Sequence, residues 1–304
     1  MTYLGEIFSL LSAMLWGLAV VYYKKAGDTI SPVALNPFKT IVGYILFLIT
    51  GVIIGQPILQ QVSSTGISQV DYFWLILSGA IGIGIADAIF FKSLNILGAG
   101  ISAIVDCLYS PSIIMLAFFL LGERLTLLQI VGFCIMIGAI LFATLKIQSV
   151  DISRKQFGYG VFLAGLSFVL MGLGVIWIKP LLENYKNDTG MLIWISGFRL
   201  LPGIIVSLII FFIVQIKRDL ISPFKNINIW PSLLKGSIIG SFVAVTFWMI
   251  GMSHTTASIA SILNQTASFF LFIFAWLILK EPITKRRVIS LVISIAGVSL
   301  VLIG

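Results

Sequence analysis

The sequence predicts an all-α integral membrane protein with ten transmembrane helices, arranged as two inverted five-helix repeats. Three observations support this fold class. Hydrophobic residues make up 59% of the 304 residues and charged residues only 10%, whereas soluble domains carry about 25% charged residues. The charged residues cluster between long apolar runs, and the second half of the chain repeats the first. A soluble fold of this size is therefore excluded.

Ten apolar runs are bounded by charged residues, prolines or polar clusters. Each is close to the roughly 20 residues that a helix needs to cross a bilayer. The runs lie near 4–23, 32–55, 72–92, 97–121, 127–146, 157–178, 190–215, 232–252, 257–279 and 286–303. We expect helices rather than strands, because barrel strands would be short and would alternate in polarity. No connection is long enough to form a soluble domain.

The second half of the chain repeats the first at a constant offset. A shift of 158 residues aligns 75–146 with 233–304 without a gap. Polar matches carry the most weight, because apolar identities are common in any membrane protein. These polar matches are Glu123 with Glu281 and Thr126 with Thr284.

The repeat predicts the domain organisation. We expect a first five-helix repeat at 1–147, a connecting loop at 148–156 and a second repeat at 157–304. Because each repeat holds an odd number of spans, the second must enter the membrane from the opposite side. Inverted repeats of this kind recur in transporters, with the substrate site near the membrane midplane between the two copies.

Small residues recur four positions apart in the third span of each repeat. They are Ser78, Gly82 and Ala86 in the first copy and Gly236, Gly240 and Ala244 in the second. Small residues at this spacing let helix backbones approach closely, which favours helix association in lipid. We therefore expect both spans to be central and tightly packed. The alternative is that Gly and Ala are simply frequent in membrane helices.

Glu123 and Glu281 lie in the short connections before the last span of each repeat. Thr126 and Gln129, three residues apart, fit a capping box at the start of the next helix. An acid near a helix start is stabilised by the helix dipole. We expect a structural role for both glutamates rather than direct contact with a substrate.

Several short motifs resemble a known family. They are "LWG" at 15–17 followed by Lys24, a basic residue early in the second span of each half, and "SP" at 110–111 leading to "LLGERLT" at 120–126. With ten spans in two halves, the chain resembles the drug/metabolite transporter superfamily, in its EamA-like branch. The resemblance implies a permease of the bacterial inner (plasma) membrane for small metabolites, often an exporter of amino acids, with a central cavity lined by both halves.

The sequence departs from the family pattern at two places. Lys39 stands where arginine is more usual, although Arg199 keeps the arginine in the second half. Phe269 lies opposite Pro111 in the repeat alignment. The family motif does not identify a substrate.

Two carboxylates inside the spans are candidates for binding or coupling. A charge at the centre of a span costs about 2.5 to 3.5 kcal/mol on insertion scales, so Asp87 and Asp106 should face a cavity or a partner. Either could bind a substrate ammonium or carry a proton. The alternative is an internal ion pair with Lys39, Lys92 or Arg199 that holds helices together.

The repeat partner of Asp106 is Asn264, followed by Gln265, so the paired sites differ in charge. Tyr109, near Asp106, belongs to a polar stripe that we expect to line a cavity, although such a stripe could also join helices. Lys39 and Arg199 could clamp a carboxylate, arginine by a two-pronged contact. Snorkelling to the interface is the alternative, above all for Lys39.

Aromatic and end-of-span residues complete the set. Trp16 shares a face of the first span with Glu6, Ser9 and Tyr23 and could line the cavity, and Trp248 is a weaker candidate. Lys24 and Lys179 lie close to span ends, where we expect them to anchor the helices at the interface. His254 should lie in a loop.

These observations favour a secondary transporter of small metabolites, with amino acids as the expected substrate class and proton coupling as a hypothesis. The alternative is a membrane protein that binds or senses a lipid or assembles a complex without moving a solute. We expect no enzyme activity, no cofactor, no metal site and no nucleic-acid partner. Only one histidine is present, and the net charge of +8 is spread over short clusters between the spans. Membrane lipid is the other expected partner.

Two arguments about orientation disagree. Most Lys and Arg residues lie in the odd-numbered connections, whereas the even-numbered ones hold only Arg124, Lys179 and Lys186. The positive-inside rule then places the odd connections in the cytoplasm and both termini outside. The family resemblance implies both termini inside.

Overall fold

The computed structural model describes residues 3–27, 30–56, 66–144, 153–215, 219, 221–280 and 285–304. In these ranges every regular element is helical. The first half comprises α1 (Leu4–Gly27), α2 (Pro32–Ile53), α3 (Gln69–Gly79), the π-helical η2 (Ala80–Ile85), α4 (Ala86–Val105), the 3₁₀ turn η3 (Asp106–Leu108), α5 (Tyr109–Leu121) and α6 (Leu127–Thr144).

The second half opens with α7 (Arg154–Ile176), the short α8 (Lys179–Asn184) and α9 (Thr189–Gln215). Two 3₁₀ turns follow, η4 (Ser222–Lys225) and η5 (Ile227–Ile229). The remaining elements are α10 (Trp230–Ser237), the π-helical η6 (Ile238–Ala244), α11 (Val245–His254), α12 (Ala257–Asn264), α13 (Ala267–Leu279) and α14 (Lys285–Ile303).

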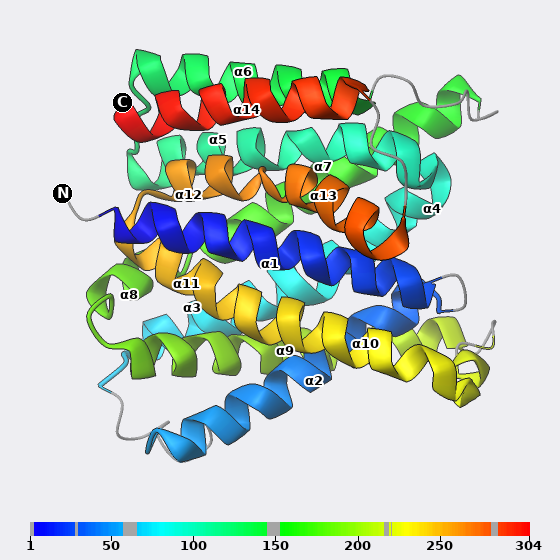
Figure 1. The fold of residues 1–304 in the computed structure, drawn as a ribbon. Coiled ribbons are helices and arrows are strands. Elements are labelled where there is room, and N and C mark those ends of the chain that lie inside the picture. The colour runs from blue at the N-terminus through cyan, green and yellow to red at the C-terminus, as the bar shows by residue number, and fades with distance from the viewer. Residues whose placement is uncertain are drawn as a thin grey trace.

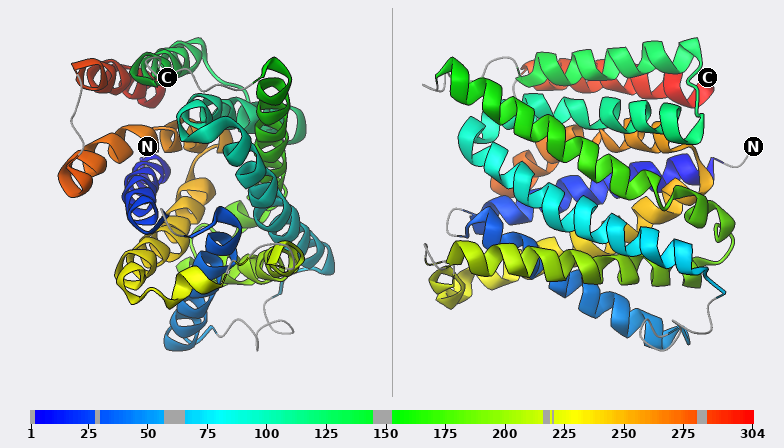
Figure 2. Two further views of the ribbon diagram at one scale, coloured as in Figure 1. Left: turned by 90° about the vertical axis from the view of Figure 1, so that its right-hand side faces the viewer. Right: turned by 180° about the vertical axis from the view of Figure 1, so that it is seen from behind.

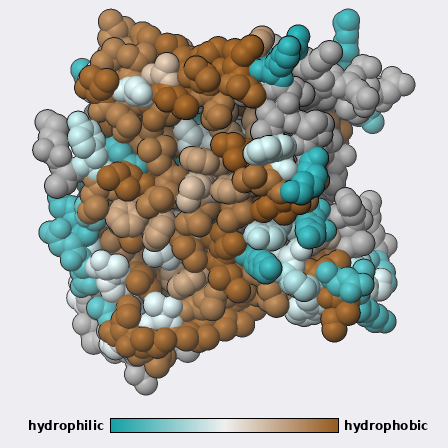
Figure 3. Space-filling model, viewed as in Figure 1, coloured by the Kyte–Doolittle hydropathy of each residue, from teal (hydrophilic) through white to brown (hydrophobic). Residues whose placement is uncertain are grey.

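Seven helical segments of the described chain are long and apolar enough to cross a membrane. They are Leu4–Ala26, Val33–Ile53, Gln69–Phe90, Arg154–Asn184, Thr189–Val214, Ile227–His254 and Ala257–Leu279. Three shorter apolar helices accompany them, at Tyr109–Leu121, Leu127–Phe142 and Val288–Ile303. Hydrophobic residues cover the middle of the visible face, and hydrophilic residues gather toward its two ends (Figure 3). The predicted all-α membrane architecture is confirmed.

The predicted boundary between the third and fourth spans differs from the one in the structure. The apolar pattern placed an interruption between 92 and 97, but α4 continues through these positions to Val105. Regular α-helix is interrupted instead at η3, directly before α5. Pro111 fits this position, because proline has no backbone N–H and is best tolerated in the first turn of a helix, which it occupies in α5.

The two halves repeat local structure at the offset seen in the sequence. The π-helical segments η2 and η6 begin 158 residues apart, and α5 and α13 both begin and end 158 residues apart. After α5, Gly122 adopts a left-handed conformation (φ 70°), and Lys280 does the same after α13 (φ 58°). Lysine rarely adopts this conformation, so its use at the equivalent turn shows that the turn geometry itself is repeated.

Both ladders of small residues lie at close helix contacts, as expected. A Cβ added to Gly174 in α7 would lie 2.9 Å from the Cα of Gly82 in η2, and one added to Gly240 in η6 would lie 2.9 Å from the Cβ of Ala19 in α1. The first helix of each half therefore packs against the π-helical segment of the other half. Such contacts depend on the absence of larger side chains.

Helices α6 and α14 form a pair at the margin of the bundle (Figures 1 and 2). Gly304 lies beside Thr126 and Gln129 at the start of α6, and Gly297 lies beside Gly132 further along it. These two helices, which occupy equivalent places in the repeat, therefore run in opposite directions. The chain termini lie at the same end of the bundle, here called the terminal end (Figure 1).

Candidate functional site

An ion pair between Lys39 and Asp87 lies inside the spans. Lys39 is on α2, and Asp87 is the second residue after η2. The Lys39 Nζ and the Asp87 Oδ2 are 3.5 Å apart, and the two side chains are 14% and 16% exposed. The wide turns of a π-helix often mark functional positions. At the equivalent position after η6 the chain has Val245, so this charge is present in one half only.

Trp16 and Arg199 bring α1 and α9 to the same region. The Lys39 Nζ lies 5.8 Å from the centroid of the Trp16 ring, a cation–π distance. Arg199 is buried, and its Nε donates to the Ser78 Oγ at 2.6 Å. Asp87 lies within electrostatic range of Arg199. The site thus combines two cations, one carboxylate and one aromatic face.

Ser78 was not identified as a site residue from the sequence. Its hydroxyl accepts from Arg199 and donates to the backbone oxygen of Gly174, so it connects α3, α9 and α7. Gly82 lies close to both neighbours of this serine, because a Cβ added to Gly82 would lie 3.1 Å from the Gly174 Cα and in van der Waals contact, at 3.4 Å, with the Arg199 Nη2. The signal in the sequence was the ladder of small residues, which we interpreted as packing alone.

Gln265, another predicted residue, belongs to a second polar group between α5 and α12. The Ser110 hydroxyl lies 2.9 Å from both the Ser261 backbone oxygen and the Gln265 Oε1. Gln265 is buried, Asn264 is half-buried, and the Tyr109 ring lies 6.0 Å from that of Phe168. Asp106 is in η3, but its side chain lies outside the described residues. Tyr109 and Gln265 lie where the two halves meet. Lys39 and Asp87, by contrast, both lie on helices of the first half, α2 and α4.

Trp248 belongs to the core rather than to this polar region. Its side chain is 9% exposed and packs in the largest hydrophobic cluster, together with Trp194, Met249 and Ile250. The expected role of Trp248 as a lining residue therefore has no support from its position.

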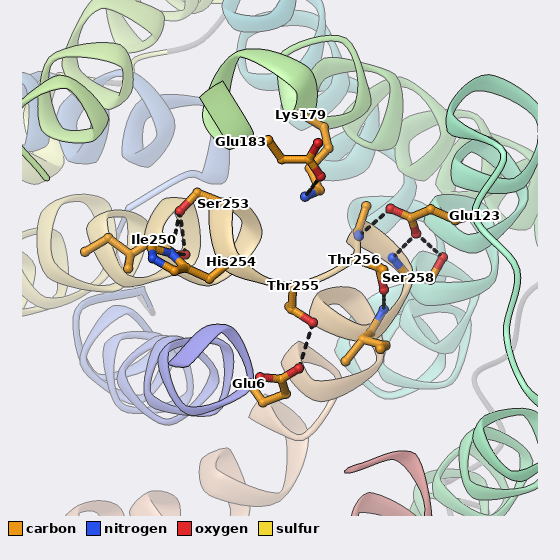
Figure 4. Close-up of polar contacts among 12 residues, drawn as sticks. Glu6, Glu123, Lys179, Glu183, Ile250, Ser253, His254, Thr255, Thr256 and Ser258 are labelled. Carbon is orange, nitrogen blue, oxygen red and sulfur yellow. Dashed lines mark hydrogen bonds and ion pairs between the residues drawn. The ribbon is translucent and has the colours of Figure 1, made fainter. Parts of the chain in front are cut away.

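Glu123 has the structural role expected from the repeat, at a helix of the other half (Figure 4). Its Oε1 accepts from the backbone N of Ala257 at 2.8 Å, and its Oε2 accepts from the backbone N and the hydroxyl of Ser258 at 2.9 and 2.6 Å. Glu123 thus caps α12. The capping box of α6 is also confirmed, with Thr126 N to Gln129 Oε1 at 2.9 Å and Gln129 N to Thr126 Oγ1 at 3.2 Å. Glu281 lies outside the described residues.

Two expectations about the terminal end were wrong. Lys179 is not an exposed anchor, because its side chain is 2% exposed and pairs with Glu183 four residues later in α8 (Figure 4). His254 is the last residue of α11 rather than a loop residue, and its Nδ1 lies 2.8 Å from the Ser253 hydroxyl. Beside it, Glu6 of α1 accepts from the Thr255 hydroxyl at 2.9 Å. Polar contacts therefore hold the α11–α12 connection against the first half.

Comparisons with known proteins identify the family and the fold. The sequence matches the model of the EamA-like transporter family over residues 3–145 and 158–303. It is 24% identical over 301 residues to an uncharacterized transporter of Methanothermobacter thermautotrophicus, covering 97% of this chain and 84% of that protein. A solved crystal structure with 15% sequence identity superimposes with a TM-score of 0.80, over 99% of this chain and 96% of that one. The last likeness shows a shared fold.

Proposed function

The chain belongs to the EamA-like transporter family and is a multi-pass membrane transporter of a small-molecule substrate, and we propose that it is a secondary transporter of charged small metabolites. Amino acids are the first substrate class to test. The proposed location is the plasma (inner) membrane, and the proposed mechanism is alternating access around a site between two inverted halves.

Three features support inverted halves. The family model matches the two halves at equivalent places. The π-helical segments η2 and η6 recur at the same offset. Helices α6 and α14, which end the two repeats, run antiparallel. We accordingly propose repeats at 1–147 and 157–304 joined by 148–156; within this linker 148–152 lie outside the described residues, and α7 already begins at Arg154.

The observation that carries the proposed site is the Lys39–Asp87 pair beside Trp16. At 1.5 Å per residue, Lys39 lies about 10 Å from the start of α2, well inside the span. Tight ion-paired hydrogen bonds measure about 2.7 to 2.9 Å, so the 3.5 Å separation of Lys39 and Asp87 is long. Both side chains keep some exposure.

A loosely held pair can exchange partners with a charged solute. An ammonium group would bind Asp87, a carboxylate would bind Lys39 or Arg199, and an apolar part would lie on the Trp16 ring. The proposal extends to Gln265, which is hydrogen-bonded to Ser110 across the two halves, and to Tyr109, which lies within electrostatic range of Arg199. Proton coupling through Asp87 remains part of the proposal, and a flux that ignores a pH gradient would remove it.

The test is flux of labelled amino acids into proteoliposomes that contain the purified protein. We expect flux with the wild type and its loss in Asp87→Asn. Asp71→Asn is the matched control, because Asp71 lies at the start of α3 and its carboxylate accepts from the neighbouring Ser68 hydroxyl. Equal flux in Asp87→Asn and the wild type would exclude Asp87 from the mechanism. A lipid-binding protein that moves no solute would give no flux for any metabolite of a broad panel.

A further inference from the structure

The two ends of the bundle differ in charge. At the end opposite the termini, exposed cations lie at the ends of several helices. They include Lys24 and Lys25 at the end of α1, Arg154 and Lys155 at the start of α7, and Lys285 and Arg286 at the start of α14. We call this the basic end, and in Figure 1 it is the side away from the N and C labels.

The terminal end has the opposite balance. Its described acids include Glu6, Asp71, Glu183 and Asp188, in addition to the cap Glu123. Its exposed cations are few in the described chain, namely Arg124 and Lys186, since Lys179 is buried against Glu183. The asymmetry therefore belongs to the folded ends and does not depend on how the connections are numbered.

Three basic-end cations lie over aromatic rings. Lys92 lies 5.6 Å from the ring centroid of Tyr159, Lys235 lies 5.9 Å from that of Tyr22, and Arg286 lies 5.6 Å from that of Phe142. Aromatic rings beside long cationic side chains are typical of the zone where hydrocarbon meets headgroups. The cations are thus placed at the depth of the lipid headgroups.

We infer that the basic end lies against the anionic headgroups of the cytoplasmic leaflet, so that both chain termini lie on the outer side of the membrane. An excess of Lys and Arg near the span ends marks the cytoplasmic side, and cations near an anionic membrane surface are attracted to it. The structure therefore favours the orientation given by charge over the one implied by family resemblance. Orientation is independent of whether the protein moves a solute.

The orientation can be tested by cysteine labelling of the full chain. Cys107→Ala and Cys134→Ala remove the native thiols. Lys155→Cys at the basic end and Lys186→Cys at the terminal end then provide matched single sites, both exposed. With a membrane-impermeant maleimide on intact bacterial cells, we expect Lys186→Cys to react and Lys155→Cys to react only after permeabilisation. The reverse pattern, or equal labelling of both, would overturn the inference.

A second measurement needs no cysteine variant. Alkaline phosphatase fused after Gly304 of the wild type should be active, because this enzyme matures only outside the cytoplasm, and an inactive but fully produced fusion would overturn the inference.

The lipid contact has its own test. In nanodiscs, phosphatidylglycerol should raise the melting temperature over phosphatidylcholine for the wild type. The rise should be smaller after Lys24→Gln, Lys25→Gln, Arg154→Gln and Lys155→Gln combined, but not after the terminal-end control Arg124→Gln with Lys186→Gln. An equal rise in all three proteins would overturn the headgroup contact.

Discussion

Replacing Gly79 with alanine should separate α3 from α9. Gly79 is the last residue of α3, and a Cβ added there would lie 2.0 Å from the backbone oxygen of Arg199 and 2.7 Å from the Cγ of Pro202. Ordinary contact begins near 3.4 Å, so one of the two backbones must move by more than an ångström. That movement also pulls Arg199 away from the Ser78 hydroxyl, which it contacts at 2.6 Å.

The expected cost follows from overpacking at a backbone contact. Extra methyl groups in a packed interior cost about 1 to 3 kcal/mol, occasionally more, and alanine recovers about 1 kcal/mol of helix propensity over glycine. Because the added Cβ would approach the Arg199 oxygen to 2.0 Å, we expect a cost at the upper end, about 3 kcal/mol. After the gain in helix propensity, Gly79→Ala should lose about 2 kcal/mol of unfolding free energy, measured by SDS-induced unfolding in mixed micelles. Gly165→Ala in α7 is the control, because a Cβ there meets nothing within 4 Å. Equal stability of the two variants would refute the close contact between α3 and α9.

Three further predictions concern charged side chains. Glu123→Gln should lose about 1 to 2 kcal/mol of unfolding free energy, because its amide nitrogen replaces one of the two acceptor oxygens at the start of α12. The control Glu6→Gln keeps an acceptor for Thr255 and should be nearly neutral. Equal losses in the two variants would contradict the capping role of Glu123. Asp87→Asn and Lys39→Gln should show a coupling of about 1 to 3 kcal/mol in a double-mutant cycle of unfolding free energies, and a coupling of zero would mean that the 3.5 Å pair does not contribute. Glu183→Ala should lower the melting temperature more than Lys179→Met, because only Glu183→Ala leaves a buried ammonium without its partner. A larger decrease for Lys179→Met in a thermal unfolding assay would be inconsistent with a buried Lys179.

Hydropathy and the internal repeat were enough to predict the helical membrane architecture. Long apolar runs must form helices in lipid, since only helices and closed barrels satisfy the backbone there. The ladder at Ser78 and Gly82 predicted a close helix contact, and the motif at Thr126 and Gln129 predicted a capping box. Both are local patterns, and the structure contains both.

Contacts between distant segments were harder to predict. Glu123 was expected near a helix start, but the helix it caps begins 134 residues later, a distance that no local pattern encodes. The ion pair of Lys179 could have been predicted from the sequence, because Glu183 lies four residues away on the same helix face. Lys39 was one of three cations considered for Asp87, and only the packing of α2 against α4 brings the two together.

The most direct test of the proposed site is calorimetric binding of a metabolite that the wild type transports. Asp87→Asn and Lys39→Gln should each weaken binding by about tenfold or more, which corresponds to about 1.4 kcal/mol, while Asp71→Asn should bind like the wild type. Unchanged affinity in both site variants would show that the substrate does not bind at the Lys39–Asp87 pair.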